Sequence, residues 1–221
     1  MAKKSSEERK EQTEKRLKEM GIAYNRYLPL IESSEDVVLK GLDDICKRAI
    51  ACLISIQVGL DIGQSDYEES KEFFADILSK YGVESCLNEK EKRLFNGNCS
   101  KQDAIDVVWT YEAYWSLVWA LGLIDDISNA GEICDCQKAI SLVSECGSLE
   151  EFKKQCHVRD IEEILDMLDL YYRYDWACTE KRFNPQTSIG GLNPEVVVER
   201  RRGLEWLISE ENDWFDISLD T

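Results

Sequence analysis

One carboxylate is conspicuous in this sequence because it lies inside the most apolar and aromatic stretch of the chain. Glu112 falls within residues 109–123, which contain three of the 6 tryptophans. Apolar residues on nearly every side predict a helix buried in the core. A buried carboxylate without a partner is very costly, so it either pairs with a cation or loses its charge. Glu112 therefore predicts a buried polar centre.

Helical periodicity identifies the charges that could face Glu112. On a 3.6-residue period, Arg201 falls on the apolar face of residues 194–208, and Arg200 lies on the shoulder of that face. Asp175 lies at the aromatic end of another such face. We expect a buried ion pair between Glu112 and one of the two arginines, because a guanidinium can hold a carboxylate with two hydrogen bonds. Asp175 would be a second acceptor. Further donors near this centre would come from Tyr111, Tyr172 and Trp176.

The residues alone leave two interpretations of this cluster open. In the first, the charges satisfy one another and fix how three helices pack, which is the usual fate of buried charges. In the second, Arg200 and Arg201 receive a small anionic ligand in a pocket, and Glu112 acts as an acceptor or base. An open cavity that reaches Glu112 would favour the second interpretation, and a solid core around it would favour the first.

The composition limits the classes of partner. The 221 residues carry a formal net charge of −17, and 43% of them are hydrophobic, as in packed globular proteins. Such a negative field repels nucleic acids and anionic membrane surfaces, so we expect neither as a partner. A basic protein partner would suit the acidic surface. No run approaches the ~20 apolar residues of a membrane span, and no secretory signal is evident, so we expect a cytoplasmic protein.

Motifs for metal, nucleotide or covalent chemistry are missing from the sequence. The 9 cysteines form no Cys-x-x-Cys pair, and the single histidine, His157, completes no zinc-binding set. The sequence contains no glycine-rich phosphate loop and no motif of a catalytic triad. We expect no metal, no cofactor and no assigned catalytic residue, and we interpret the cysteines as reduced thiols. A thiol switch at Cys134 and Cys136 is a weaker alternative.

Signals for helices recur along the chain, and signals for strands do not. We expect one all-α domain over residues 19–221, with seven to eight helices around the Trp-rich helix. Residues 1–18 alternate charges without an apolar stripe, so we expect a solvated or frayed helix there. Side chains suited to capping precede several helices, namely Ser65, Ser148, Asp160 and Asn193. The expected helices span residues 7–20, 35–60, 66–80, 101–121, 137–146, 149–156, 161–182 and 194–208.

Several motifs in combination are similar to those of a known family. They are Trp109-x-Tyr111-Glu112-Ala113, Glu132-Ile133-Cys134-Asp135, Trp176-Ala177-Cys178 and Glu199-Arg200-Arg201. Together they resemble an uncharacterised, mostly bacterial family known as domain of unknown function 4272, and the resemblance extends over residues 16–221. It implies a mostly helical single domain without a settled activity. Glu112, Arg200 and Arg201 fall within family motifs, whereas Asp175 departs from the family pattern.

The leading functional expectation is a non-enzymatic binding protein whose acidic surface meets a protein partner. This expectation depends on the net charge of −17 and on the lack of a catalytic motif. The alternative is a small-molecule enzyme or ligand-binding protein that uses Glu112 with Arg200 and Arg201 to hold an anionic ligand. A third hypothesis is that residues 1–18 dock onto another chain.

Overall fold

Capping side chains fix where most helices begin. Ser148, Asp160 and Asn193 each accept a hydrogen bond from a backbone N–H in the first turn of the helix that follows, which confirms these three predictions. The prediction at Ser65 is wrong, because the helix there begins after Asp66 and has no side-chain cap. Most of the boundaries therefore follow from local chemistry.

A computed structural model of the protein describes residues 3–221, and all regular structure within them is helical. The prediction of an all-α single domain is confirmed, with more helices than the seven to eight expected. The helices are α1 (Ser6–Glu19), α2 (Leu42–Asp61), α3 (Tyr67–Tyr81), the short 3-10 helix η1 (Glu84–Cys86), α4 (Glu89–Phe95), α5 (Lys101–Trp109), α6 (Tyr111–Ala120), α7 (Cys136–Ser144), α8 (Leu149–Gln155), α9 (Ile161–Phe183) and α10 (Pro194–Ile208).

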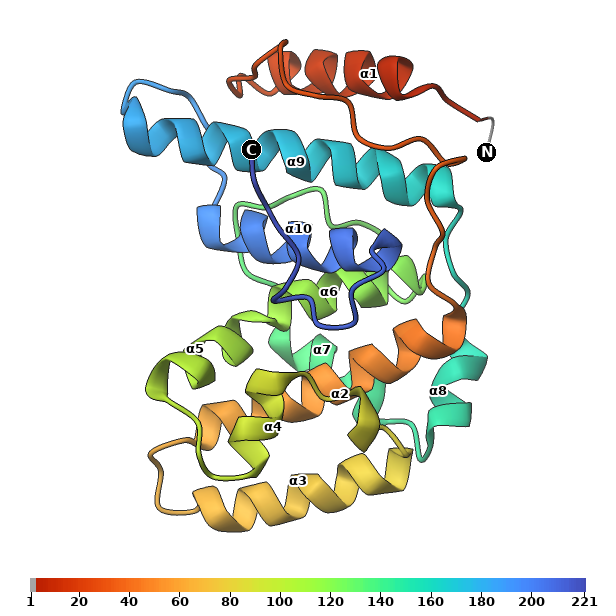
Figure 1. Cartoon of the computed structure of the whole chain (residues 1–221), viewed down its shortest axis with the longest axis vertical. Coiled ribbons are helices and arrows are strands. Elements are labelled where there is room, and N and C mark those ends of the chain that lie inside the picture. Colours follow the sequence, from red (N-terminus) through yellow and green to blue (C-terminus); the bar gives the residue numbers. More distant parts are fainter. Residues whose placement is uncertain (1–2) are drawn as a thin grey trace.

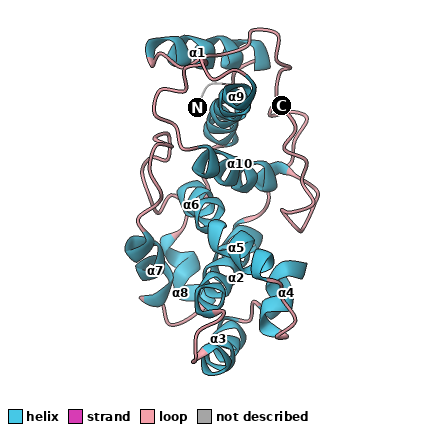
Figure 2. Cartoon of the chain, turned by 90° about the vertical axis from the view of Figure 1, so that its left-hand side faces the viewer, coloured by secondary structure: helices cyan, strands magenta, loops and turns pink. Residues whose placement is uncertain are grey.

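The helices stack along the long axis of the molecule. From one end to the other, the order is α1, α9, α10, α6, then α2 beside α5, and finally α3 (Figures 1 and 2). Helix α10 packs against both α6 and α9, and α2 packs against α3, α5 and α6. Every residue of α6 is buried. Glu112, in the first turn of α6, therefore lies well inside the stack.

The single helix expected over residues 101–121 is wrong, because the chain forms two helices there. Helix α5 ends at Trp109 and α6 begins at Tyr111. At Thr110 the backbone N–H bonds to the carbonyl of Val107 at 3.1 Å, and the hydroxyl bonds to the same carbonyl. Hydrogen bonds between residues three apart tighten the last turn of a helix. A threonine hydroxyl that bonds to a backbone carbonyl also competes with the regular helical hydrogen bonds and favours an interruption of the helix.

The helix expected over residues 35–60 begins later, at Leu42. Before it, the Ser33 hydroxyl donates to Asp36 at 2.6 Å, and the backbone N–H of Lys40 bonds to the carbonyl of Leu207 at 2.9 Å. The chain from 37 to 41 therefore lies against the end of α10 instead of continuing the helix. Helix α4 falls between the expected helices 66–80 and 101–121, where no helix was expected. Its signal was the capping box that Asn88 forms with the third residue of α4.

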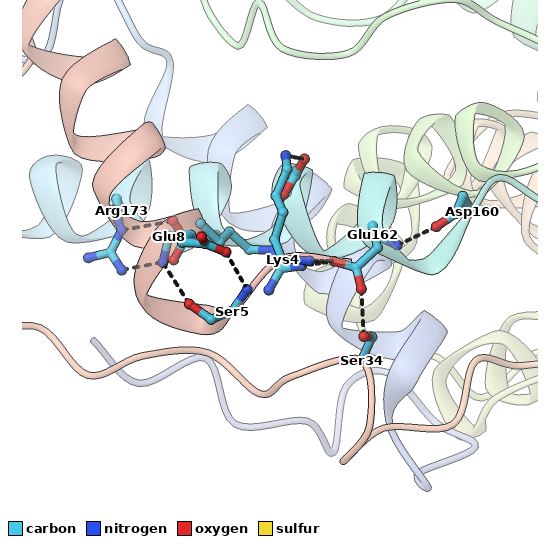
Figure 3. A network of polar contacts seen from close by, with 10 residues as sticks. Lys4, Ser5, Glu8, Ser34, Asp160, Glu162 and Arg173 are labelled. Atoms are coloured by element: carbon cyan, nitrogen blue, oxygen red, sulfur yellow. Dashed lines mark hydrogen bonds and ion pairs between the residues drawn. The ribbon is translucent and has the colours of Figure 1, made fainter. Parts of the chain in front are cut away.

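The N-terminal segment is a packed helix and not a solvated one. In α1, Leu17 is fully buried and Arg9 is 1% exposed. Arg9 donates to Glu162 and Asp166 of α9. Glu162 also accepts from the Ser34 hydroxyl (Figure 3). Ion pairs between distant elements therefore replace the apolar stripe that the sequence lacks. Residues 1–2 of the expected segment lie outside the described residues.

Candidate functional site

Each carboxylate oxygen of Glu112 accepts one hydrogen bond. Of the two arginines expected as partners, Arg200 makes the contact, with its Nε 2.8 Å from Glu112 Oε2, and the backbone N–H of Cys134 donates to Oε1 at 2.7 Å. Glu112 is 2% exposed and Arg200 is 3% exposed. Burial by itself would lower the pKa of Arg200, but Tyr171 and Glu112 outweigh burial and raise it. Arg200 is therefore a stable cation at this buried position.

The other nitrogens of Arg200 bind the irregular segment between α6 and α7. Its Nη1 donates to the carbonyls of Ile127 and Asn129, at 3.1 and 2.6 Å, and approaches the Tyr171 hydroxyl at 3.3 Å. Its Nη2 donates to the carbonyl of Glu132 at 3.2 Å. The Tyr171 hydroxyl donates to the same Ile127 carbonyl. One guanidinium thus joins α6, α9 and α10 to this segment.

Arg201 forms a second and separate ionic centre. Its Nη1 lies 2.6 Å from Asp175 Oδ2 and 2.9 Å from the carbonyl of Leu219, and its Nη2 donates to the carbonyl of Asp220 at 3.2 Å. The guanidinium lies over the ring of Tyr172, 4.9 Å from its centroid. Arg201 of α10 therefore joins Asp175 of α9 to the C-terminal segment.

Of the side chains expected at the Glu112 centre, Asp175 and Tyr172 lie at the Arg201 centre instead, and Tyr111 and Trp176 have other surroundings. The hydroxyl of Tyr111 instead accepts a hydrogen bond from Gln57 Nε2 of α2 at 2.8 Å. Trp176 is partly buried and packs against the edge of the core as an apolar side chain. Periodicity placed Trp176 on the apolar face of its helix, and Tyr111 precedes Glu112 in the chain, but both side chains make these other contacts instead.

Three further buried ion pairs among residues 3–221 were not predicted from the sequence. They are Arg9 with Glu162, Arg48 with Glu91, and Arg173 with Asp169. A signal for Arg48 is present in the sequence. Like Glu112, it is a single charged residue among the apolar residues of a buried helix face, here that of α2. Arg9 and Glu162 join α1 to α9, whereas Arg173 and Asp169 both belong to α9.

The Glu112 centre offers little for covalent or metal chemistry. Burial and the nearby Glu112 charge raise the pKa of the Cys134 thiol, which keeps the thiol protonated and unreactive. Within residues 3–221, no group of three or more histidine, cysteine or acidic side chains is arranged to hold a metal ion. In the same part of the chain, no helix is both long and apolar enough to cross a bilayer.

Five cavities of the fold lie away from Glu112. None of the five principal cavities around residues 3–221 is lined by Glu112, Arg200 or Arg201. The largest, about 740 Å³, lies where residues 36–41 pass the start of α2 and the end of α10. We call it the acidic cavity, because its charged lining consists of Lys40 and five carboxylates, namely those of Glu32, Asp36, Asp44, Glu205 and Glu210.

Two charged groups in the acidic cavity are perturbed by their surroundings. Burial raises the pKa of Glu205, and the charge of Arg201 only partly offsets this effect. Burial also lowers the pKa of Lys40, against the opposing effects of Asp44 and Glu211. The ammonium of Lys40 donates to the carbonyl of Ser209 at 2.7 Å, so this cation is already engaged.

Comparison with known proteins shows the family of the chain. A family model described as a domain of unknown function, DUF4272, matches residues 9–217. No curated protein and no solved structure matches the chain. The matched residues include the Glu112–Arg200 centre and the residues that line the acidic cavity. The protein therefore belongs to the DUF4272 family, as its sequence motifs predict.

Proposed function

We propose that this protein is a non-enzymatic binding protein that takes a basic segment of a partner protein into the acidic cavity. The main support is the lining of that cavity, where Glu205 pairs with Arg201 at 3.3 Å and four further carboxylates stand against one lysine. Negative walls around a concave surface attract cationic side chains and speed their association. The apolar part of the lining, which includes Val37, Leu39 and Ile217, would pack against the aliphatic stems of lysine or arginine.

We infer a structural role for the Glu112–Arg200 centre. Both carboxylate oxygens of Glu112 and all three nitrogens of Arg200 have hydrogen-bond partners within the fold. A ligand would have to break these bonds, and the alternative of an anionic ligand at Glu112 therefore has less support. In this proposal the centre fixes the Trp-rich α6 in the middle of the core. We also propose a cytoplasmic location, because nine free cysteines suit a reducing compartment.

Removal of three carboxylates from the acidic cavity should weaken binding of a basic peptide. The cavity variant combines Glu32→Gln, Asp44→Asn and Glu210→Gln, three exposed side chains on the cavity wall. Labelled hexalysine, followed by fluorescence anisotropy, serves as the probe. We expect the dissociation constant to rise about tenfold, because each exposed ion pair contributes about 0.2–1 kcal/mol.

A matched control separates the cavity from the general negative field of the protein. The control variant, Glu69→Gln with Glu72→Gln and Asp76→Asn, removes the same charge from exposed positions of α3 that line none of the five cavities. We expect it to bind hexalysine within about twofold of the parent protein at moderate salt. Equal losses in both variants, or no binding to the parent, would refute the proposal.

The raised pKa of Glu205 predicts how this residue makes the folding stability of the protein depend on pH. When the pKa of a carboxyl group is higher in the folded than in the unfolded protein, protonation of that group stabilises the fold. The stabilisation is complete below the unfolded pKa and is lost as the pH rises through the folded pKa. Burial places Glu205 in this class. We expect the stability of Glu205→Gln, relative to the parent, to improve from about pH 4 to about pH 7. Urea unfolding at both pH values measures this difference, and a constant difference would contradict it.

A further inference from the structure

Two cysteine thiols are in contact where α8 packs against the first half of α2 (Figures 1 and 2). Cys46 lies in α2, and Cys156 is the residue at which α8 ends. The Cys46 thiol is hydrogen-bonded to the sulfur of Cys156. A third cysteine nearby, Cys146, instead accepts a hydrogen bond from Gln155 Nε2 at 3.1 Å. Cys46 and Cys156 therefore form a thiol pair that bridges two helices.

An ion pair fixes the position of α8 along α2 and, with it, the contact between the sulfurs. Lys153 Nζ lies 2.8 Å from Asp43 Oδ1. Cys46 follows Asp43 by one helical turn in α2. Cys156 likewise follows Lys153 by one turn at the end of α8. Because residues one turn apart share a helix face, the register that joins the two charges also places the two sulfurs opposite each other.

The two sulfurs differ in their access to solvent. Cys46 is fully buried, whereas Cys156 is partly exposed. The thiol of Cys156 also donates to the carbonyl of Phe152 at 3.2 Å, which holds it at the end of α8. A small oxidant dissolved in water can therefore reach Cys156 but not Cys46. The pair thus offers one sulfur for attack and a second, protected sulfur directly beside it.

The hydrogen bond between the thiols also makes them unequal as nucleophiles. It lowers the pKa of Cys156 below its usual value, against the opposing effect of burial. The same hydrogen bond, together with burial, raises the pKa of Cys46. Since the thiolate is the reactive form, Cys156 is the sulfur that reacts first. Cys134 differs in this respect, because burial and the charge of Glu112 raise the pKa of its thiol.

We propose that Cys156 is a site of oxidation by hydrogen peroxide and that Cys46 then forms a reversible disulfide with it. In the first step, the Cys156 thiolate attacks one peroxide oxygen, the O–O bond breaks, and the hydroxide released takes up a proton to become water. In the second step, the Cys46 sulfur attacks the sulfur of the Cys156 sulfenic acid, and the S–O bond breaks. The departing hydroxide combines with the proton of Cys46 to give a second water. Two thiols are thereby oxidised, and one peroxide is reduced to two waters.

The arrangement suits a reversible bond rather than a permanent one. A disulfide requires its two sulfurs to approach to about 2 Å, so a pair already in hydrogen-bond contact needs only a small movement. In a reducing compartment such a bond is temporary, and thiol reductants return it to the dithiol form. The proposal concerns the contact between α2 and α8 and does not depend on peptide binding in the acidic cavity.

Peptide mapping of the full chain tests the proposal. The folded protein is treated with limiting hydrogen peroxide, the remaining thiols are blocked with iodoacetamide in urea, and the chain is digested with trypsin without reductant. Trypsin leaves Cys46 and Cys156 in separate peptides with one cysteine each, residues 41–47 and 155–159. We expect mass spectrometry to detect these two peptides joined by a disulfide before any other cross-link forms, and to detect them separately after treatment with dithiothreitol.

Cys99 is the matched control within the same chain. It is partly exposed, like Cys156, but it is hydrogen-bonded to the Tyr67 hydroxyl instead of to a thiol. Its tryptic peptide, residues 94–101, contains no other cysteine. We expect Cys99 to be oxidised at least about tenfold more slowly than Cys156.

Two substitutions separate the roles of the thiols. In Cys46→Ala the second step is blocked, so oxidised Cys156 should persist as a sulfenic acid that dimedone traps. Cys146→Ala is the control, because Cys146 lies near Cys156 without the hydrogen bond, and the disulfide should form within about twofold of the parent rate. The proposal is overturned if Cys99 is oxidised as fast as Cys156. It is also overturned if peptide 155–159 is joined first to the Cys146 peptide, residues 139–153, or to no peptide at all.

Discussion

Glu112→Gln should lower the free energy of unfolding by about 3–5 kcal/mol, the usual loss when one partner of a buried ion pair is removed. The glutamine amide has one acceptor oxygen, whereas Glu112 receives donors from both Arg200 Nε and the Cys134 N–H. Whichever way the amide turns, its NH₂ group faces one of these donors. Arg200 also loses the countercharge that its burial requires. Urea unfolding of the variant and the parent measures the loss.

A partly exposed glutamate with an arginine partner is the control for this substitution. Glu163 lies 3.2 Å from Nη1 of Arg159, which precedes α9 by two residues, and the Glu163 side chain is 31% exposed. Glu163→Gln should cost less than about 1 kcal/mol, because water screens such pairs. If Glu112→Gln costs no more than Glu163→Gln, the buried centre does not stabilise the fold as proposed.

The second large effect is expected at the contact between α6 and α10. A Cβ on Gly203 would lie 2.5 Å from the carbonyl oxygen of Ala113 and 3.0 Å from Ser116 Cβ. Alanine is the better helix former by about 1 kcal/mol, so Gly203→Ala would stabilise an isolated helix. In this fold, however, the two backbones must separate, and we expect a net loss of about 1–3 kcal/mol in urea unfolding.

Gly59 in α2 provides the comparison for this prediction. Its added Cβ would lie 3.2 Å from a methyl group of Val108, a side chain that can move, rather than against backbone. Gly59→Ala should therefore cost clearly less than Gly203→Ala, because improved helix propensity offsets the tight contact. A Gly203→Ala protein as stable as its parent would show that α6 and α10 do not pack as closely as described.

The sequence predicts the helical framework where local signals are strong. The bounds of α10 match the expected 194–208, because an asparagine cap and a proline at the first helical position mark its start. Periodicity also identifies Glu112 and a partner arginine, but it cannot choose between Arg200 and Arg201. The reason is that α10 packs against α6 on one side and α9 on the other, so adjacent residues both face buried carboxylates.

Other parts of the structure have no local signature. The carbonyls of Ile127, Asn129 and Glu132 that surround Arg200 belong to irregular backbone, and a carbonyl is the same at every residue. The packing of α1 depends on Arg9 and on carboxylates more than 150 residues away along the chain. The cavities form where distant segments meet, such as residues 36–41 and the end of α10. These features depend on the tertiary arrangement rather than on periodicity.

The central claim is that the Glu112–Arg200 centre stabilises the fold, whereas the acidic cavity binds the partner. Its most direct test measures folding stability and peptide binding on two variants of the protein. Glu112→Gln alters the buried centre, and the cavity variant alters the acidic cavity. Under conditions in which both are folded, we expect Glu112→Gln to be markedly less stable yet to bind hexalysine within about twofold of the parent. The cavity variant should be as stable as the parent and bind about tenfold more weakly. A folded Glu112→Gln protein that has lost peptide binding, beside a cavity variant that binds normally, would contradict the claim and place the binding site at Glu112.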